Sequence, residues 1–175
     1  MNLPNKLTLL RIIAIPVFIV VLLMGHRYAA TIIFIAAAIT DMLDGHIARK
    51  YNLVTNFGKL MDPLADKLLV MAALVCLVEL NDVAGWMVIV ILAREFAVTG
   101  LRQVAASEGI VIAAGVTGKI KTITQMIAIP LLLLDNWPCR YIGLPLDQIF
   151  LWIAVIMTIV SGAEYIIKNK QLLSM

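Results

Sequence analysis

The chain has 175 residues, of which 62% are hydrophobic and 14% charged, and its mean hydropathy is +1.00. This composition is far more apolar than that of a soluble domain, so it excludes a soluble enzyme and indicates an integral membrane protein. The formal net charge of +3 does not indicate nucleic-acid binding, because the basic residues are spread among many short connections and lack aromatic platforms.

Six apolar stretches follow one another along the chain, each of about the length that crosses a bilayer as a helix. They cover residues 8–25, 29–48, 60–80, 83–104, 118–135 and 148–167. Because they fill nearly the whole sequence, we expect an all-α, polytopic membrane protein with six transmembrane helices in one domain, residues 1–175. The first stretch carries Arg11 and has no small-residue cleavage site, so we expect it to be retained rather than removed as a signal peptide.

Lysine and arginine residues between these stretches predict the orientation in the membrane. If the N-terminus is cytoplasmic, twelve of the 14 fall on the inner side, and only Arg27 and Arg140 fall on the outer side. Trp86, Trp137 and Trp152 then lie at outer ends of the stretches, where indole rings favour the interface. We therefore expect a multi-pass protein of the cytoplasmic membrane with both termini in the cytoplasm.

Four aspartates at fixed spacing interrupt the second and third stretches: Asp41, Asp44, Asp62 and Asp66. A helix advances about 100° per residue, so the first two lie about 60° apart and the last two about 40° apart around their helices. Each pair therefore shares a helix face, and the intervening residues leave room for a turn between two antiparallel helices. One Asp at the centre of a membrane helix costs about 2.5–3.5 kcal/mol, so four together require cations.

Two kinds of cation could neutralise these carboxylates. Arg49, Lys59 and Lys67 could form ion pairs with them. Small residues also lie among the aspartates, at Gly45, Ala48 and Gly58. They have no role in an ion-pair network, but they make room for a ligand. Carboxylates that hold Mg²⁺ or Mn²⁺ beside a diphosphate are a recurrent arrangement for transfer at phosphorus, and we expect that arrangement here.

The complete pattern, D-x2-D-G-x2-A-R-x8-G-x3-D-x3-D, resembles the signature of the CDP-alcohol phosphatidyltransferases. Its eight fixed positions are filled without a departure by Asp41, Asp44, Gly45, Ala48, Arg49, Gly58, Asp62 and Asp66. Residues 2–11, 61–67, 93–95 and 100–102 further resemble members that use sn-glycerol 3-phosphate as the acceptor. The resemblance implies a homodimer that transfers the phosphatidyl group of CDP-diacylglycerol to sn-glycerol 3-phosphate, giving phosphatidylglycerophosphate and CMP.

The resemblance also implies a role for each aspartate, with two divalent cations, Mg²⁺ or Mn²⁺, as cofactors. Asp41 and Asp62 would contact both ions and Asp44 would contact one. Asp66 would contact the second ion and act as the general base. The spacing by itself does not rank the four, but a carboxylate shared with a metal can still accept a proton from a hydroxyl beside it.

Contacts to CDP-diacylglycerol are expected from residues near the aspartates and in the first stretch: Asn5, Thr8, Gly45, Ala48, Arg49, Thr55 and Gly58. Gly45 and Ala48 permit close approach of the cytidine, and Arg49 can form two hydrogen bonds to the diphosphate. Thr55, Asn5 and Thr8 match family positions that contact the nucleotide. The alternatives are an ordinary loop hydroxyl for Thr55 and a helix cap for Asn5.

Four basic residues lie near the inner ends of the fourth and fifth stretches: Arg94, Arg102, Lys119 and Lys121. Together they suit the phosphate of the acceptor. The alternative is that they are anchors at the membrane surface, with Glu95 paired to one of them. Because Arg94 falls about twelve residues into its stretch, an anchor explains it poorly, and we expect a phosphate site.

Other functions share part of this pattern. A sister enzyme that uses inositol phosphate, serine or choline would keep the aspartates and differ in the acceptor pocket, and the basic set favours a phosphorylated acceptor. A cation transporter also places carboxylates in membrane helices, but this chain has no internal repeat, and its acids cluster near one face of the membrane. A soluble prenyl-diphosphate enzyme is excluded by the hydropathy.

Overall fold

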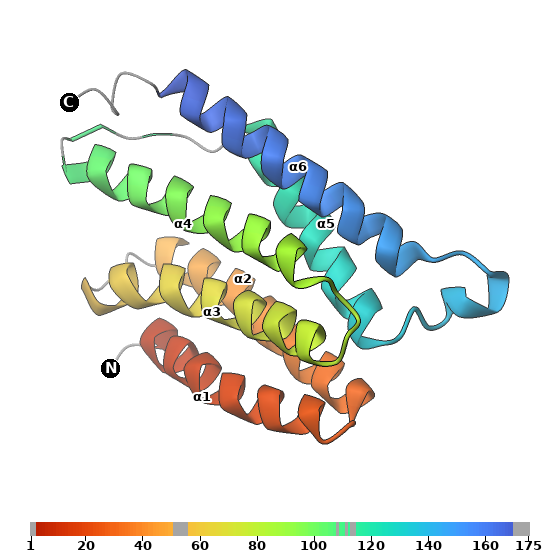
Figure 1. The fold of residues 1–175 in the computed structure, drawn as a ribbon. Coiled ribbons are helices and arrows are strands. Elements are labelled where there is room, and N and C mark those ends of the chain that lie inside the picture. The colour runs from red at the N-terminus through yellow and green to blue at the C-terminus, as the bar shows by residue number, and fades with distance from the viewer. Residues whose placement is uncertain (1–2, 51–55, 108, 111, 113–114, 170–175) are drawn as a thin grey trace. The chain divides into compact units, whose positions relative to one another are not determined.

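The computed structural model describes residues 3–50, 56–107, 109–110, 112 and 115–169 (Figure 1). For residues 3–6, 42–50, 56–63, 66 and 142 it describes the backbone alone. The described residues fold into helices and contain no β-strand. The all-α prediction is therefore confirmed.

Six α-helices lie in the described part of the chain: α1 (Leu3–Leu23), α2 (Arg27–Lys50), α3 (Asn56–Glu79), α4 (Gly85–Ser107), α5 (Val116–Leu133) and α6 (Leu146–Lys168). A short 3₁₀ helix, η1 (Cys139–Ile142), precedes α6. Each α-helix overlaps one of the six predicted stretches. Several helices extend beyond the predicted apolar stretches into polar residues, because the backbone hydrogen bonds of a helix do not require apolar side chains.

Two of the described helices are long and apolar enough to cross a membrane, Val116–Leu133 and Leu146–Lys168, and Leu7–Leu23 is a shorter apolar helix. Helix α4 does not belong to this apolar group, because it carries the charged residues Arg94, Glu95 and Arg102 in its middle and near its end. These helices indicate a membrane protein.

Contacts within the chain form two compact units, Met1–Asp82 and Val83–Met175. In the first unit, α1 packs against both α2 and α3. The rings of Phe18 and Phe34 join α1 to α2, with centroids 6.1 Å apart, and both side chains are buried. Leu74 and Leu77 supply buried side chains from α3. The prediction of a single domain stays a prediction.

In the second unit, α5 packs along α6, and α4 also contacts α6. Ile129 of α5 and Leu151 of α6 are almost fully buried. The half-exposed rings of Trp86 and Trp152 lie 5.7 Å apart near the starts of α4 and α6. This packing fixes one helix face against another and so determines which polar residues of α4, α5 and α6 meet.

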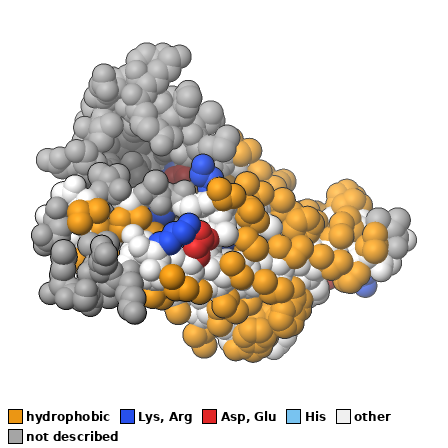
Figure 2. All heavy atoms as spheres, turned by 90° about the horizontal axis from the view of Figure 1, so that it is seen from above, with side chains coloured by type: hydrophobic (Ala, Val, Ile, Leu, Met, Phe, Trp, Pro, Cys, Tyr) orange, Lys and Arg blue, Asp and Glu red, His pale blue; other side chains and the backbone are white. Residues whose placement is uncertain are grey.

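Large apolar side chains remain exposed on the outer face of α6, including Ile153, Ile156, Ile159 and Ile167. On the face that Figure 2 shows, hydrophobic side chains cover much of the described surface. A soluble monomer rarely exposes so large an apolar surface, whereas lipid tails cover such a surface well.

Candidate active site

The two pairs of aspartates lie on two helices of the first unit, as their spacing predicted. Asp41 and Asp44 belong to α2, and Asp62 and Asp66 belong to α3. The side chain of Asp41 is 32% exposed. The side chains of the other three lie outside the described residues, so the arrangement of the four carboxylates stays a prediction.

Arg11 of α1 pairs with Asp41 of α2. Its Nη1 atom lies 2.6 Å from Oδ1 of Asp41, and only 1% of the arginine side chain is exposed. A buried guanidinium requires an anionic partner, because removing its charge from water is costly. The ion pair therefore joins α1 to α2 and holds one oxygen of a predicted metal ligand.

Arg11 is not among the site residues that the sequence predicts. The sequence did carry a signal for it. Arg11 follows Thr8 by three residues, which places the two side chains on neighbouring positions of one helix face. Thr8, a predicted nucleotide contact, is fully buried on that helix.

For most other residues predicted to contact CDP-diacylglycerol, the structure describes the backbone alone. Asn5 belongs to α1, and Gly58 lies in the first turn of α3. Gly45, Ala48 and Arg49 follow Asp44 within α2. Their side chains, and Thr55 as a whole, lie outside the described residues, so these contacts stay predictions.

The aspartates suit a hard divalent cation as ligands, since Mg²⁺ and Mn²⁺ prefer carboxylate oxygens. Asp41 offers a carboxylate that is partly exposed while Arg11 holds one of its oxygens. Among the side chains that the structure describes, no group of three His, Cys, Asp or Glu could hold a metal ion. Three of the four predicted ligands are not among them.

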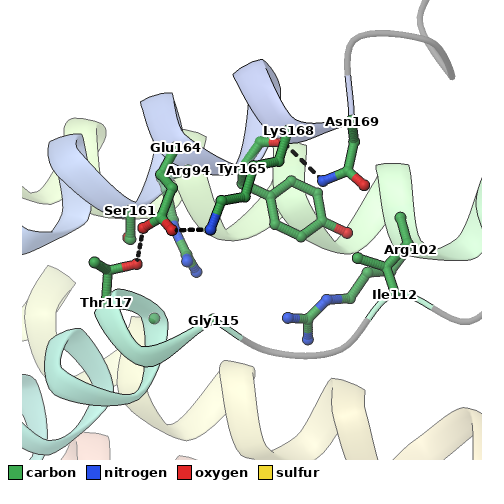
Figure 3. Close-up of a pocket in the computed structure, with 11 residues that line it drawn as sticks. Arg94, Arg102, Ile112, Gly115, Thr117, Ser161, Glu164, Tyr165, Lys168 and Asn169 are labelled. Carbon is green, nitrogen blue, oxygen red and sulfur yellow. Dashed lines mark hydrogen bonds and ion pairs between the residues drawn. The ribbon is translucent and has the colours of Figure 1, made fainter.

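A polar pocket of about 240 Å³ lies in the second unit (Figure 3). Three basic side chains line it: Arg94, Arg102 and Lys168. Its other lining residues are Ile112, Gly115, Thr117, Gly118, Ser161, Glu164, Tyr165 and Asn169. The volume is below the roughly 300–1,000 Å³ of pockets for drug-sized ligands, so it suits a small polar ligand.

Two of the four predicted phosphate-binding residues, Arg94 and Arg102, line this pocket together. Lys121 instead donates a hydrogen bond of 2.8 Å from Nζ to Oε1 of Glu95, and only 3% of its side chain is exposed. Lys119 is exposed on α5 and is not part of this pocket lining. The alternative interpretation, in which one of the basic residues pairs with Glu95, therefore applies to Lys121.

Glu95 also accepts a hydrogen bond of 2.8 Å from Nη1 of Arg94. One carboxylate thus bridges two of the predicted cations, from α4 and from α5. Arg94 therefore has two roles here: its guanidinium pairs with Glu95, and its side chain lines the pocket.

Helix α6 supplies pocket residues that the sequence analysis missed. Glu164 accepts hydrogen bonds from Thr117 of α5 and from Lys168. Tyr165 is 7% exposed, and its hydroxyl has no hydrogen-bond partner among the described residues. The guanidinium of Arg102 lies 5.6 Å from the centre of the Tyr165 ring, within cation–π distance.

A sequence signal existed for these residues too. Ser161, Glu164, Tyr165 and Lys168 follow the spacing i, i+3, i+4 and i+7, which places them on one helix face. In an otherwise apolar stretch, such a polar face indicates a polar partner. With three cations and one carboxylate, the pocket has an excess of positive charge, which favours an anion such as a phosphate monoester.

Comparison with known proteins places the chain among membrane-lipid enzymes. A curated relative from Bacillus subtilis, named CDP-diacylglycerol–glycerol-3-phosphate 3-phosphatidyltransferase, is 51% identical over 98% of this chain and 97% of its own length. Relatives with the same name from Rickettsia bellii and Shigella flexneri are 45% and 37% identical, each over 94% of this chain and 93% of its own length. The family model for CDP-alcohol phosphatidyltransferase matches residues 1–160. The chain therefore belongs to the CDP-alcohol phosphatidyltransferase family.

Proposed function

We infer that this protein transfers the phosphatidyl group of CDP-diacylglycerol to sn-glycerol 3-phosphate, giving phosphatidylglycerophosphate and CMP. The observation that carries this inference is the 51% identity to the Bacillus subtilis enzyme over nearly the full length of both chains. The unbroken signature from Asp41 to Asp66 supports it, because it supplies the acidic residues that this chemistry requires.

On the donor side, Asp41, Asp44, Asp62 and Asp66 hold two divalent cations, Mg²⁺ or Mn²⁺. When bound, these ions would neutralise the charge that develops on CMP, the leaving group, as the diphosphate linkage is cleaved. Arg11 fixes one oxygen of Asp41, with its Nη1 atom 2.6 Å from Oδ1. A carboxylate whose orientation is fixed by such a partner loses less freedom when it binds a cation.

In the transfer step, a hydroxyl of the acceptor attacks the phosphorus that carries the lipid. A new bond forms between the hydroxyl oxygen and this phosphorus, and the bond from phosphorus to the oxygen shared with CMP breaks. Asp66 accepts the proton of the attacking hydroxyl, and CMP leaves with the electron pair of the broken bond. Arg49, in the helix that carries Asp44, hydrogen-bonds the diphosphate.

On the acceptor side, the pocket of the second unit binds the phosphate of sn-glycerol 3-phosphate. Arg94 and Arg102 supply guanidinium groups that match phosphate geometry, and Lys168 adds a third positive charge. The pocket supports a revision of the predicted set, in which Lys168 joins the two arginines. Lys121 then contributes through Glu95 rather than by direct contact.

The proposed topology has six membrane spans, both termini in the cytoplasm, and an active site that opens to the cytoplasm. The distribution of lysine and arginine supports the orientation. Six α-helices in the described chain overlap the six apolar stretches, which supports the number of spans. We also propose a homodimer, an expectation that rests on the family resemblance.

A test of this function uses purified protein in detergent with CDP-diacylglycerol, Mn²⁺ or Mg²⁺, and one acceptor at a time, following CMP release. We expect rapid release with sn-glycerol 3-phosphate and little with glycerol, serine or inositol phosphate. Glycerol is the matched control, because it has the hydroxyl groups and lacks the phosphate. CMP release with another acceptor and none with sn-glycerol 3-phosphate would overturn the assigned acceptor and leave the family in place.

A further inference from the structure

The side chain of Arg94 is more enclosed than a surface arginine. Only 14% of it is exposed, whereas 69% of the Lys168 side chain is exposed at the same pocket. Its Nη1 atom donates to Glu95, and its Nε atom is buried with no hydrogen-bond partner among the described residues. The arginine is therefore held in one position by its surroundings.

Two glycines on the neighbouring helices make room for this side chain. A Cβ atom at Gly162 of α6 would lie 3.1 Å from Cγ of Arg94, and one at Gly118 of α5 would lie 3.3 Å from Nη2. Both distances are shorter than ordinary contact, so a methyl group at either position would displace the arginine by a few tenths of an ångström. At Gly100, within α4, an added Cβ would meet nothing within 4 Å.

Glycine is a poor residue for the interior of a helix, since alanine forms helices more readily. Gly162 lies in the interior of α6 and Gly118 in the first turn of α5, and both face the side chain of Arg94 of α4. Lys121 donates to the same oxygen of Glu95 that accepts from Arg94, which fixes the carboxylate as well. Three helices thus contribute to the position of one guanidinium.

The geometry points to an arginine slot, formed by Gly118, Gly162 and Glu95, that positions the guanidinium of Arg94 to bind the phosphate of the acceptor. This inference rests on the proposed function. Glu95 accepts a hydrogen bond from Nη1 of Arg94. The other terminal nitrogen, Nη2, lies beside Gly118, and Gly118 lines the pocket. The three are positioning residues, because they act through Arg94 and do not need to touch the substrate.

A separate observation indicates that the pocket receives a polar ligand. The hydroxyl of Tyr165 is buried in the pocket wall without a partner among the described residues, and a buried polar group of this kind is costly. Figure 3 shows the hydroxyl pointing from α6 toward the side on which Arg102 lies. A phosphate oxygen in the pocket could accept a hydrogen bond from this hydroxyl while Arg94 binds another oxygen.

The test compares KM for sn-glycerol 3-phosphate with KM for CDP-diacylglycerol in purified variants. Gly162→Ala and Gly118→Ala each add one methyl group against Arg94, and Gly100→Ala adds the same group in open space. Arg94→Ala and the double variant Gly162→Ala/Arg94→Ala complete the set. Size exclusion and thermal unfolding check the fold, and equilibrium dialysis with labelled sn-glycerol 3-phosphate replaces KM for any variant too slow to assay.

We expect Gly162→Ala and Gly118→Ala to raise the acceptor KM about three- to tenfold, since small misplacements of a positioning group are costly, with the donor KM unchanged. Gly100→Ala should behave as the parent. The double variant should match Arg94→Ala alone, because a glycine that acts only through the arginine has no effect once the arginine is gone. If Gly162→Ala does not fold, Gly118→Ala gives the same readout.

Three other results have distinct meanings. If Arg94→Ala raises the acceptor KM while both glycine variants match the parent, the arginine slot is wrong and the phosphate pocket stands. The slot is also wrong if the two substitutions of the double variant have additive effects. If Arg94→Ala changes neither KM, or both equally, the proposed acceptor pocket itself is wrong.

Discussion

Replacing Arg11 with methionine would remove the buried guanidinium that pairs with Asp41 and leave a side chain about as long as the aliphatic part of the arginine. Breaking a fully buried ion pair costs about 3–5 kcal/mol, and one hydrogen bond to a charged group contributes about 1.5–3 kcal/mol. The lower range applies here, because the Asp41 side chain is 32% exposed and water can replace part of the lost contact. We therefore expect a loss of about 1.5–3 kcal/mol in the free energy of unfolding.

The same substitution should weaken the cation site more selectively than it weakens the fold. Partners that orient a metal ligand typically contribute about 10- to 100-fold to metal affinity. We expect the Mn²⁺ concentration for half-maximal activity to rise by about this factor in Arg11→Met. The assay is CMP release over a Mn²⁺ titration, together with the shift in melting temperature that Mn²⁺ produces.

Arg27→Met provides a matched control in the same unit. Arg27 pairs with Asp82 at 2.8 Å, and both side chains are partly exposed. Arg27 and Asp41 share α2, and their separation of 14 positions corresponds to about 21 Å along the helix. The control should lose some stability and keep the Mn²⁺ dependence of the parent. Equal Mn²⁺ dependence in Arg11→Met and the parent would refute the role assigned to the ion pair.

Four further predictions concern the metal, the base and the pocket. Excess EDTA should abolish CMP release and added Mg²⁺ or Mn²⁺ should restore it, so persistent turnover in chelator would contradict the two-cation site. Asp66→Asn should remove turnover and keep substantial binding of CDP-diacylglycerol, and unchanged turnover would exclude Asp66 as the base. Lys168→Gln should raise the acceptor KM severalfold while Lys119→Gln leaves it unchanged, and the reverse order would contradict the lining of the pocket. Tyr165→Phe should raise the acceptor KM several- to tenfold if its hydroxyl donates to the phosphate, and no change would assign the hydroxyl another role.

Helix positions were predictable from the sequence, because long apolar stretches must form helices in a membrane to satisfy their backbone hydrogen bonds. The placement of Asp41 and Asp44 on one helix, and of Asp62 and Asp66 on the next, followed from spacing alone. The division of the contacts into two units did not, because it depends on which helix faces are complementary.

The basic residues show where helical geometry could have improved the prediction. Arg94 and Arg102 are eight residues apart, which places them about 80° apart around α4, and both line the pocket. Lys119 and Lys121 are two residues apart, about 200° around α5, so one side chain is exposed and the other is buried. Two cations at this spacing on one helix could not both have faced the same pocket.

The pairing of Glu95 with both Arg94 and Lys121 could not be read from the sequence. Spacing identifies the face of one helix, but the rotation of α4 relative to α5 comes from side-chain packing across several helices. The unpartnered hydroxyl of Tyr165 depends on the same packing, since Arg102 and α6 must first be placed.

The central claim is the identity of the acceptor, and a competition assay tests it most directly. The purified protein would receive CDP-diacylglycerol, Mn²⁺ and equal concentrations of sn-glycerol 3-phosphate, inositol phosphate and serine, with the lipid products identified by mass spectrometry. We predict phosphatidylglycerophosphate as the dominant product, formed in equal amount to the CMP released. A different phospholipid as the dominant product would contradict the proposed function.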